Sequence, residues 1–503
     1  MSEAAILYRP LHSLTTDETG LVGGKAVSLG RLIRSHWSVP DGFCLTTHAY
    51  NDYLDITGLR QRLTLLLERK AFEEMRWEEL WDLGLRVRSL FLKTPLPETI
   101  FQELKFPLEE AFAGKRVVVR SSSPSEDTLA ASFAGLHDSY VNICGAPKIL
   151  DMVRLVWASL WSDRSLLYRQ ELGLNPETSA MAVIIQEMVV GDCSGVAFSH
   201  CPGRESLAVI EAVWGLNLGL VDGDVEPDRL LLDRHNGTIV EKYAPERDRA
   251  CRVAGSGIVL APLPPEIRHL SPLGLECIEA VWQLLRTAET LFGGPQDLEW
   301  TFREGSLHVL QARPITASHQ ATEGERAWYL SLKRSFDALR ELRRTIEQEW
   351  IPNLTSKASQ LASVDLKDLK DDELAAAISE RRKVLSDAEE SYRELCIPMA
   401  HGIRLFGEVY NDRLRPNDPF AFLKVLAAET ELLAVKRNQA LPLIRNPFSP
   451  PGTNSLQNIS VTCYGRSVRK RPASWAYCPC CYRWVALPAR RIELTSWPMS
   501  RPF

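Results

Sequence analysis

The sequence has no apolar run of about 18 residues, the length that a membrane-spanning helix needs. Its first residues, Met-Ser-Glu-Ala-Ala, lack a basic segment followed by an apolar one, so we expect no signal peptide. The eleven cysteines do not form a disulfide framework, because seven of them are scattered at unrelated spacings, as in reduced proteins. No internal repeat is present. These absences predict a cytoplasmic protein without membrane spans.

An excess of positive charge is also missing. The chain has 59 basic and 64 acidic residues, a net charge of −5, which argues against general affinity for nucleic acid. A hydrophobic fraction of 45% and a charged fraction of 24% exclude global disorder and collagen. The charge is uneven, however: residues 441–503 carry nine bases and one acid, which leaves −13 for the first 440 residues. This asymmetry predicts a tail that differs from the body.

The length of 503 residues corresponds to about three domains. Residues 1–320 alternate strand-like and helix-like segments, with strands expected over 116–120 and 181–190, an amphipathic helix over 149–168 and a hairpin over 298–311. This pattern predicts an α/β (α+β) fold with antiparallel pairs. Residues 325–440 are densely charged and have helical periodicity, which predicts a helical module. From about residue 441 no periodicity holds, so this tail is expected to be irregular.

Two segments near the N-terminus are candidates for binding an anion. Gly23-Gly24-Lys25 allows close backbone approach and supplies a cation, although a plain glycine turn before a helix is the alternative. It is not a P-loop, since the glycine spacing is wrong and Ala26 stands where a hydroxyl is needed. Arg120 ends a β-branched run and precedes three serines, a combination suited to phosphate oxygens. The alternative is a strand that leads into a solvated serine-rich turn.

Two strand-like segments further along the chain are candidates for binding a base and a metal ion. The segment Gln186-Glu187-Met188-Val189 closes a long strand, where main-chain groups and an amide can read a base against an apolar wall. Pairing in the last hairpin would bring Glu299 near Gln311, and these oxygen donors suit Mg²⁺. Arg313 would then meet the same phosphates. A core strand and an ordinary surface hairpin are the respective alternatives.

The order of these motifs resembles one known family. The matching segments are Gly23-Gly24-Lys25-Ala-Val-Ser-Leu-Gly30 with Val39-Pro40-Asp41-Gly42-Phe43, Val119-Arg120-Ser-Ser through Ser132-Phe133-Ala134-Gly135, Gln186-Glu187-Met188-Val189 with Gly195-Val196-Ala197-Phe198-Ser199, and Glu299-Trp300 with Leu310-Gln311-Ala312-Arg313-Pro314. Together they resemble the pyruvate phosphate dikinase and phosphoenolpyruvate synthase family, which includes rifampicin phosphotransferase and the ATP-binding subunit of phenylphosphate synthase. The resemblance covers roughly residues 10–320.

The resemblance implies an ATP-grasp domain that binds ATP and Mg²⁺, with lobes at 1–190 and 191–320 followed by a helical linker at 325–440. By position, Lys25, Arg120 and Arg313 would bind phosphate and act in catalysis, while Gly135 and Ser139 would belong to the loop that covers the phosphates. The resemblance also implies the remaining contacts: adenine at Gln186, Glu187 and Val189, ribose or metal at Glu211, and Mg²⁺ at Glu299 and Gln311.

Some positions depart from the family. Leu136 and Ser139 replace Gln and Thr, and Gly215-Leu216-Asn217-Leu218 replaces Gly-Leu-Gly-Glu. The family's phosphate-carrying histidine lies in a Thr-x-Gly-Gly-x-x-Ser/Cys-His motif, and none of the ten histidines has that context. His137, in the expected phosphate loop, is interpreted as a solvated histidine, with a nucleotide contact as the alternative.

The absence of the histidine motif leaves several functions open. The first is the ATP-binding part of a phosphoenolpyruvate synthase-like phosphotransferase that acts on a histidine elsewhere. The others are a fragment of a rifampicin phosphotransferase-like protein, the ATP-binding subunit of a split system, a truncated gene product, and a non-catalytic nucleotide- or partner-binding module. The tail cysteines Cys463, Cys478, Cys480 and Cys481 leave a zinc site open. The tail itself is interpreted as a shifted reading frame, as disorder or as a surface wrap.

Overall fold

The computed structural model describes residues 6–124, 136–201, 204–221, 223–255, 257–315 and 336–426. These residues form two compact units, one of residues 6–315 and 411–419 and the other of residues 336–410 and 420–426. The sites predicted at Gly135 and in the tail from residue 441 lie outside the described residues. No helix within the described ranges is long and apolar enough to cross a membrane.

The first sheet has five strands in the order β1-β2-β5-β3-β4, with every neighbouring pair antiparallel. The strands are β1 (Tyr8–Pro10), β2 (Gly42–Leu45), β3 (Val117–Ser122), β4 (Ser139–Ile143) and β5 (Ala182–Glu187). The helices of this part are α1 (Thr19–Arg34), α2 (Thr47–Ile56), α3 (Leu59–Leu67), α4 (Trp77–Lys93), α5 (Glu98–Phe112), α6 (Ala146–Ser159) and α7 (Asp163–Glu171). The strand expected over 181–190 is therefore shorter and ends at Glu187.

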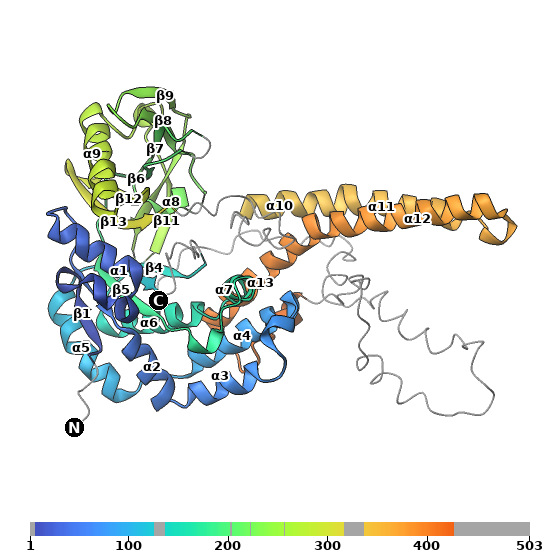
Figure 1. Cartoon of the computed structure of the whole chain (residues 1–503), viewed down its shortest axis with the longest axis horizontal. Coiled ribbons are helices and arrows are strands. Elements are labelled where there is room, and N and C mark those ends of the chain that lie inside the picture. The colour runs from blue at the N-terminus through green and yellow to red at the C-terminus, as the bar shows by residue number, and fades with distance from the viewer. Residues whose placement is uncertain are drawn as a thin grey trace. The chain divides into compact units, whose positions relative to one another are not determined.

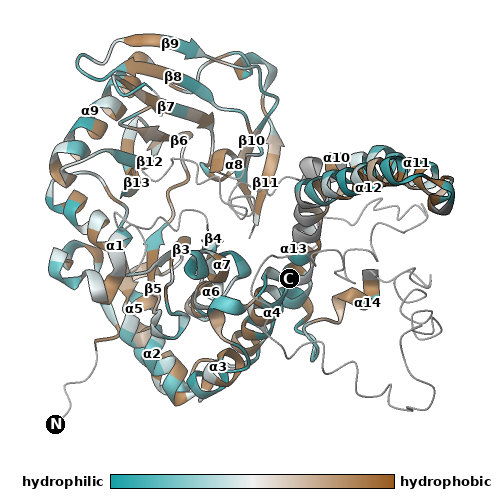
Figure 2. Ribbon diagram, turned by 45° about the vertical axis from the view of Figure 1, so that its right-hand side comes forward, coloured by the Kyte–Doolittle hydropathy of each residue, from teal (hydrophilic) through white to brown (hydrophobic). Residues whose placement is uncertain are grey.

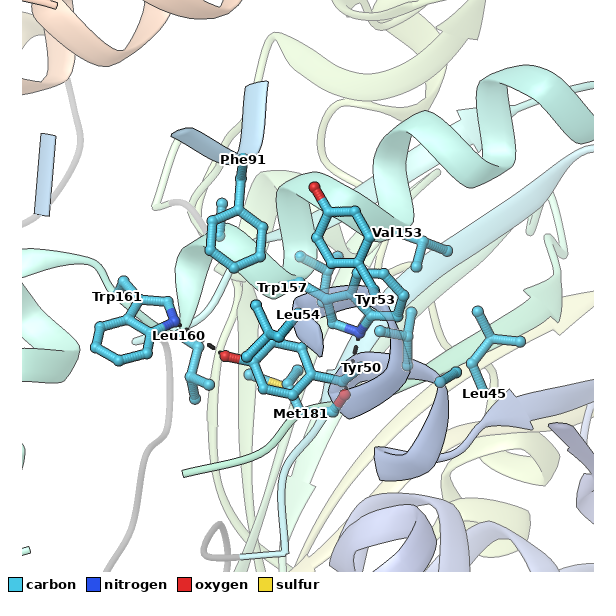
Figure 3. Close-up of a cluster of buried hydrophobic side chains, with 14 of the residues drawn as sticks. Leu45, Tyr50, Tyr53, Leu54, Phe91, Val153, Trp157, Leu160, Trp161 and Met181 are labelled. Atoms are coloured by element: carbon cyan, nitrogen blue, oxygen red, sulfur yellow. Dashed lines mark hydrogen bonds between the residues drawn. The ribbon is translucent and has the colours of Figure 1, made fainter. Parts of the chain in front are cut away.

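Helices cover both faces of the first sheet (Figure 1). Alternation along β5 sends Val183 and Ile185 into the core shared with α2–α7, and Ala182 and Ile184 into a second core against α1. Burial on both faces explains why this strand is a continuous apolar run. Figure 3 shows the aromatic centre of the larger core, where Tyr53 stacks on Trp157 at 5.2 Å between ring centroids.

The amphipathic helix expected over 149–168 is wrong as a single helix. The structure breaks it into α6 and α7, because Ser162 forms an N-cap whose hydroxyl accepts a hydrogen bond from the Ser165 amide. The apolar period continues across the break, since Leu160 and Leu166 are both buried in the same core. The hydrophobic pattern alone therefore hides the boundary.

The second sheet has six antiparallel strands in the order β13-β12-β6-β7-β8-β9. They are β6 (Cys193–Phe198), β7 (Leu207–Trp214), β8 (Asp228–Asp233), β9 (Ile239–Tyr243), β12 (Gln296–Arg303) and β13 (Ser306–Pro314). Helix α9 (Leu275–Phe292) covers one face, where Ala197, Ile210 and Leu230 share its apolar core. A short helix α8 (Leu218–Val221) and a separate hairpin of β10 (Arg249–Ala254) and β11 (Gly257–Pro262) complete this part.

The second unit is helical in its described residues. It contains α10 (Phe336–Thr345), α11 (Ile351–Ala362), α12 (Asp371–Ser391), α13 (Ile397–Leu414) and α14 (Phe422–Leu426), with π-helical turns at Ile346–Trp350 and Tyr392–Cys396. Helices α11 and α12 run side by side, and both mix hydrophilic and hydrophobic residues along their length (Figures 1 and 2). The last residues of α13, from Asn411 on, belong to the first unit.

Candidate functional site

A polar row crosses the uncovered face of the second sheet. Glu299 on β12 lies opposite Gln311 on β13 and opposite Val196 on β6. Val196 lies opposite Glu211 on β7, which in turn lies opposite Arg229 on β8. Side chains directly opposite one another in antiparallel strands project to the same face, so all five share the face that α9 leaves uncovered. The pairing of Glu299 with Gln311 expected from the hairpin is present.

A β-bulge beside Glu299 provides a carbonyl oxygen of the hairpin that bonds to the first sheet. Glu299 pairs with Gln311 but Trp300 pairs with Val309, so Leu310 is the extra residue. The Leu310 carbonyl oxygen accepts a hydrogen bond of 3.0 Å from Arg120 Nη1, and Arg120 Nη2 lies 2.5 Å from Glu299 Oε2. Arg120 therefore reaches from the first sheet to the polar row of the second.

The non-helical Gly23 interrupts α1 at the Gly23-Gly24-Lys25 segment, so the longer part of the helix, which carries Lys25, follows this glycine, as the expected glycine turn before a helix predicts. The helix is kinked at Gly23, whose φ and ψ are 79° and 162°. At the kink the Ser122 hydroxyl donates to the Val22 carbonyl oxygen and accepts from the Ala26 amide, replacing the helical bond between these two residues. Ser122 thus fixes the kink against the end of β3, and Lys25 Nζ lies 3.4 Å from Ser121 Oγ.

Three cations act on Glu299. Burial by itself would raise the pKa of this carboxyl, but Arg120, Arg313 and Lys25 lower it below its usual value. The cations come from β3, β13 and α1, which lie in different parts of the sequence. Glu299 is therefore an ionised carboxylate at the centre of a positively charged cluster.

A second pair of carboxyl groups has a different electrostatic environment. Asp297 is buried and forms an ion pair with Arg313, with 2.6 Å between Arg313 Nη2 and Asp297 Oδ2. Burial raises the pKa of Glu211, Arg229 lowers it at an N–O distance of 3.6 Å, and the charge of Asp297 raises it further, so that the net shift is upward. The nearby cations thus outweigh the effect of burial on the pKa of Glu299, whereas Arg229 does not outweigh it at Glu211.

These opposite shifts predict opposite effects of removing the charge. Glu299, with its lowered pKa, stabilises the fold above its unfolded pKa of about 4.3, and this contribution disappears as the pH falls below that value. Glu211, with its raised pKa, costs stability as the pH rises from about 4.3 through its folded pKa. At pH 7, Glu299→Gln should therefore lower the free energy of unfolding by about 2 kcal/mol, whereas Glu211→Gln should leave it unchanged or raise it.

Urea denaturation at pH 7 and pH 4 measures both effects. The control is Glu304→Gln, whose side chain is 83% exposed and should have no effect at either pH. The Glu299→Gln deficit should shrink at pH 4, because the carboxyl group of the unfolded wild type is then largely protonated whereas that of the folded state keeps its lowered pKa. A deficit that is equal at both pH values, or a destabilised Glu211→Gln variant, would contradict the described charge distribution.

The residues predicted to contact adenine lie where β5 ends, at the border with the second sheet. The Gln186 amide is buried and donates to the Pro40 carbonyl oxygen at 3.0 Å, so it supports the strand end. Glu187 Oε2 lies 2.7 Å from Lys115 Nζ, and Val189 is half-buried. Around them, an apolar cluster joins the two sheets, made up of Met188, Leu216 and Cys251 with the half-buried Val118, Leu218, Val253 and Ile258.

The described chain resumes at Leu136, three residues before the predicted site residue Ser139. Ser139 begins β4 and pairs with Arg120 across the sheet. Leu136, which departs from the family, is buried against Tyr168. His137 is buried and its Nδ1 lies 3.1 Å from the Ser165 hydroxyl, so the interpretation as a solvated histidine is wrong.

Two residues of the site escaped the sequence reasoning. The sequence presents Ser122 only as one of three hydroxyls after a strand, and nothing local indicates that it bonds to α1, 100 residues away. Asp297 had a usable signal, because the hairpin pairing that brings Glu299 to Gln311 also brings Asp297 to Arg313. The consequence is that Arg313 already has a carboxylate partner.

Comparison with known proteins decides the family. Residues 19–333 match the family described as "Pyruvate phosphate dikinase, AMP/ATP-binding domain". The chain belongs to this family. The matched residues include the polar row, the kinked α1 and the adjoining strand ends described above. The description of the family supports ATP as the ligand of this domain.

Curated relatives carry different names. A probable phosphoenolpyruvate synthase from Methanothermobacter thermautotrophicus is 34% identical over 317 residues, which cover 62% of this chain and 46% of that protein. A rifampicin phosphotransferase from a Streptomyces species is 36% identical over 307 residues, 60% of this chain and 35% of that protein. A prodigiosin-synthesizing transferase from Serratia marcescens is 32% identical over 308 residues, 60% of this chain and 32% of that protein. The match thus covers less than half of each relative and supports a phosphotransferase family.

The donor set at Glu299 and Gln311 fits Mg²⁺. In the part of the chain that the structure describes, no three His, Cys, Asp or Glu side chains are grouped to share a metal ion. Mg²⁺ does not need such a group, because it is commonly held by one or two protein oxygens together with phosphates and water. A carboxylate and an amide oxygen on opposite strands, with Asp297 and Glu211 on the same sheet, satisfy that chemistry.

Proposed function

We propose that this chain binds Mg-ATP in an ATP-grasp arrangement between its two sheets and donates a phosphoryl group to a histidine on another domain or polypeptide, as in phosphoenolpyruvate synthase-like (pyruvate, water dikinase-like) chemistry. The observation that carries the proposal is the convergence of Lys25, Arg120 and Arg313 on Glu299 from three separate elements. Phosphoryl transfer depends mainly on positioning and on positive charge around the phosphates, which such a cluster supplies.

Each predicted residue that the structure describes has a role in this proposal. Lys25, Arg120 and Arg313 bind phosphate oxygens, and Ser139, opposite Arg120, adds a hydroxyl. Glu299 and Gln311 would hold Mg²⁺, which neutralises phosphate charge when bound. Adenine lies against the apolar cluster around Met188 and is read by the main chain at Glu187 and Val189, with Gln186 bracing the strand end, while Glu211 takes the ribose hydroxyls.

The histidines of this sequence support a separate phosphate acceptor. None of the ten histidines stands in the phosphohistidine motif, and His137 is buried against Ser165. We therefore propose that the product of the reaction is a phosphohistidine outside this sequence. The names of the relatives indicate that different final acceptors are served by this kind of domain.

Isothermal titration calorimetry with Mg-ATP tests the binding proposal. The wild type should bind, and Lys25→Ala should bind roughly ten- to hundredfold more weakly, because a charge-assisted contact to phosphate is lost. Lys105→Ala is the control, since Lys105 forms only an exposed helical ion pair with Glu109. Absence of heat with the wild type, or equal affinities of both variants, would exclude this site as the nucleotide site.

Transfer is tested by adding an isolated phosphohistidine domain from a phosphoenolpyruvate synthase together with ATP labelled in its transferable phosphates. The expected result is an acid-labile label on the added domain that Lys25→Ala reduces in parallel with binding. Tight Mg-ATP binding without labelling would instead assign the chain to the non-catalytic nucleotide-binding modules.

A further inference from the structure

A buried arginine on α4 connects two distant parts of the chain. Arg88 has only 9% of its side chain exposed although it lies in the middle of a helix. A buried guanidinium requires hydrogen-bonded anionic partners. Arg88 has two of them, Asp138 just before β4 and Asp412 near the end of α13, which is 324 residues away in sequence.

The geometry uses every nitrogen of the guanidinium. Asp412 takes two parallel bonds, from Nε at 3.0 Å and from Nη2 at 2.8 Å, the fork arrangement that is strongest for arginine and carboxylate. Nη1 donates to Asp138 Oδ2 at 3.1 Å, and Nη2 also contacts the Tyr140 hydroxyl at 3.2 Å. The Tyr140 hydroxyl in turn donates to Asp138 Oδ2 at 3.2 Å. Arg88 is thus a bridge between Asp412 and the beginning of β4.

The segment 411–419 forms a second contact with α4. Lys93 Nζ donates to the Asn417 carbonyl oxygen at 2.7 Å. Within the segment, the buried Asn411 amide donates to the Pro419 carbonyl oxygen at 3.0 Å, which closes the chain into a compact turn. These contacts agree with the assignment of 411–419 to the first unit, while the residues before and after it belong to the second. The segment therefore begins in the last residues of α13 and packs against α4.

The other end of the bridge lies beside the proposed phosphate site. Asp138 is followed directly by Ser139, which pairs with Arg120 across β3 and β4. Tyr140 pairs with Val119, so the two residues that Arg88 contacts, Asp138 and Tyr140, flank Ser139 on either side. A shift of Asp138 would therefore move Ser139 relative to the Arg120 guanidinium.

We propose that Asp412 is a positioning residue for the nucleotide site, acting through Arg88: when the segment 411–419 is docked, β4 is held in register beside Arg120, and when it is released the affinity for Mg-ATP falls. This inference rests on the proposed function. Linkage requires the effect to be reciprocal, so Mg-ATP must strengthen the docking of 411–419 by the same factor. Nucleotide occupancy is thereby communicated to segment 411–419, whose neighbours on both sides in sequence belong to the helical unit.

The test is calorimetry of Mg-ATP binding to the full chain carrying Asp412→Asn, with Asp387→Asn on the exposed face of α12 as the matched control. Asp412→Asn should weaken binding about fivefold to tenfold, within the range typical of coupling between sites, and Asp387→Asn should not. Arg88→Lys keeps the charge but cannot form the fork, so in this background Asp412→Asn should have no further effect. The absence of this non-additivity would overturn the inference.

Hydrogen exchange supplies a readout that a merely structural role would not move. Mg-ATP should slow exchange in residues 411–419 of the wild type and should not do so in Arg88→Lys. If the wild type binds Mg-ATP and Asp412→Asn lowers only the melting temperature, the inference fails and the proposed function stands. If the wild type does not bind Mg-ATP, both fail.

Discussion

Replacing Arg120 with methionine is expected to lower the free energy of unfolding by about 3–5 kcal/mol, the cost of leaving a buried charge without its partner. The partner is Glu299, whose side chain is 15% exposed and whose bond to Arg120 is 2.5 Å long. Lys25 and Arg313 remain near Glu299, but Arg120 is the cation that bonds directly to its carboxylate. The loss should therefore be much larger than for an exposed ion pair.

The double variant Arg120→Met/Glu299→Gln separates stability from function. With both charges removed, the desolvation penalty disappears and stability should return to within about 1–2 kcal/mol of the wild type. Mg-ATP binding should stay lost, because the phosphate contact and the metal donor are both gone. The control Arg204→Met/Glu241→Gln removes an ion pair that is about half exposed and should change stability by less than about 1 kcal/mol.

Urea denaturation and calorimetry on the same samples measure the two quantities. If the double variant is as unstable as Arg120→Met alone, the packing of β3 against the hairpin, and not the ion pair, determines the loss. Recovery of Mg-ATP binding in the double variant would show that Arg120 and Glu299 serve the fold only.

The hairpin of β12 and β13 was predictable because its register depends on local geometry. Arg303 pairs with Ser306, so the loop contains only Glu304 and Gly305, and both have positive φ, at 52° and 77°. Such a two-residue loop sets the pairings from Arg303–Ser306 to Trp300–Val309, and the bulge at Leu310 then shifts the register so that Glu299 lies opposite Gln311 instead of Leu310. The chemistry of the site therefore depends on the turn and on the bulge together.

The contacts between the sheets were not predictable in the same way. Arg120 and Glu299 are 179 residues apart, and Arg88 and Asp412 are 324 residues apart. Neither pair follows from periodicity, because each depends on how separate elements pack. The family resemblance placed Arg120 and Glu299 in one site, whereas Arg88 and Asp412 belong to no motif and required the structure.

Gly23→Ala is expected to be the most damaging change in α1. The φ and ψ of 79° and 162° fall in a region that is essentially restricted to glycine. A Cβ atom at this position would lie 2.3 Å from the Ser122 backbone oxygen and 2.5 Å from Ser122 Oγ. The hydroxyl can rotate but the backbone oxygen cannot, so relief requires the kink to move away from β3. We expect a loss of about 3–5 kcal/mol in the free energy of unfolding, together with weakened Mg-ATP binding.

Gly20→Ala is the matched control, because Gly20 lies three residues earlier, in the short helical part of α1 that precedes the break at Gly23. No atom lies within 4 Å of the Cβ that it would gain, and its φ is not positive. Alanine there should raise the free energy of unfolding by about 0.5–1 kcal/mol, as expected for glycine replaced inside a helix. Urea denaturation of the pair thus has opposite expected signs. If both variants changed the free energy of unfolding equally, Gly23 would have no special conformational role. The position of Lys25 beside Ser121 would then not depend on the kink at Gly23.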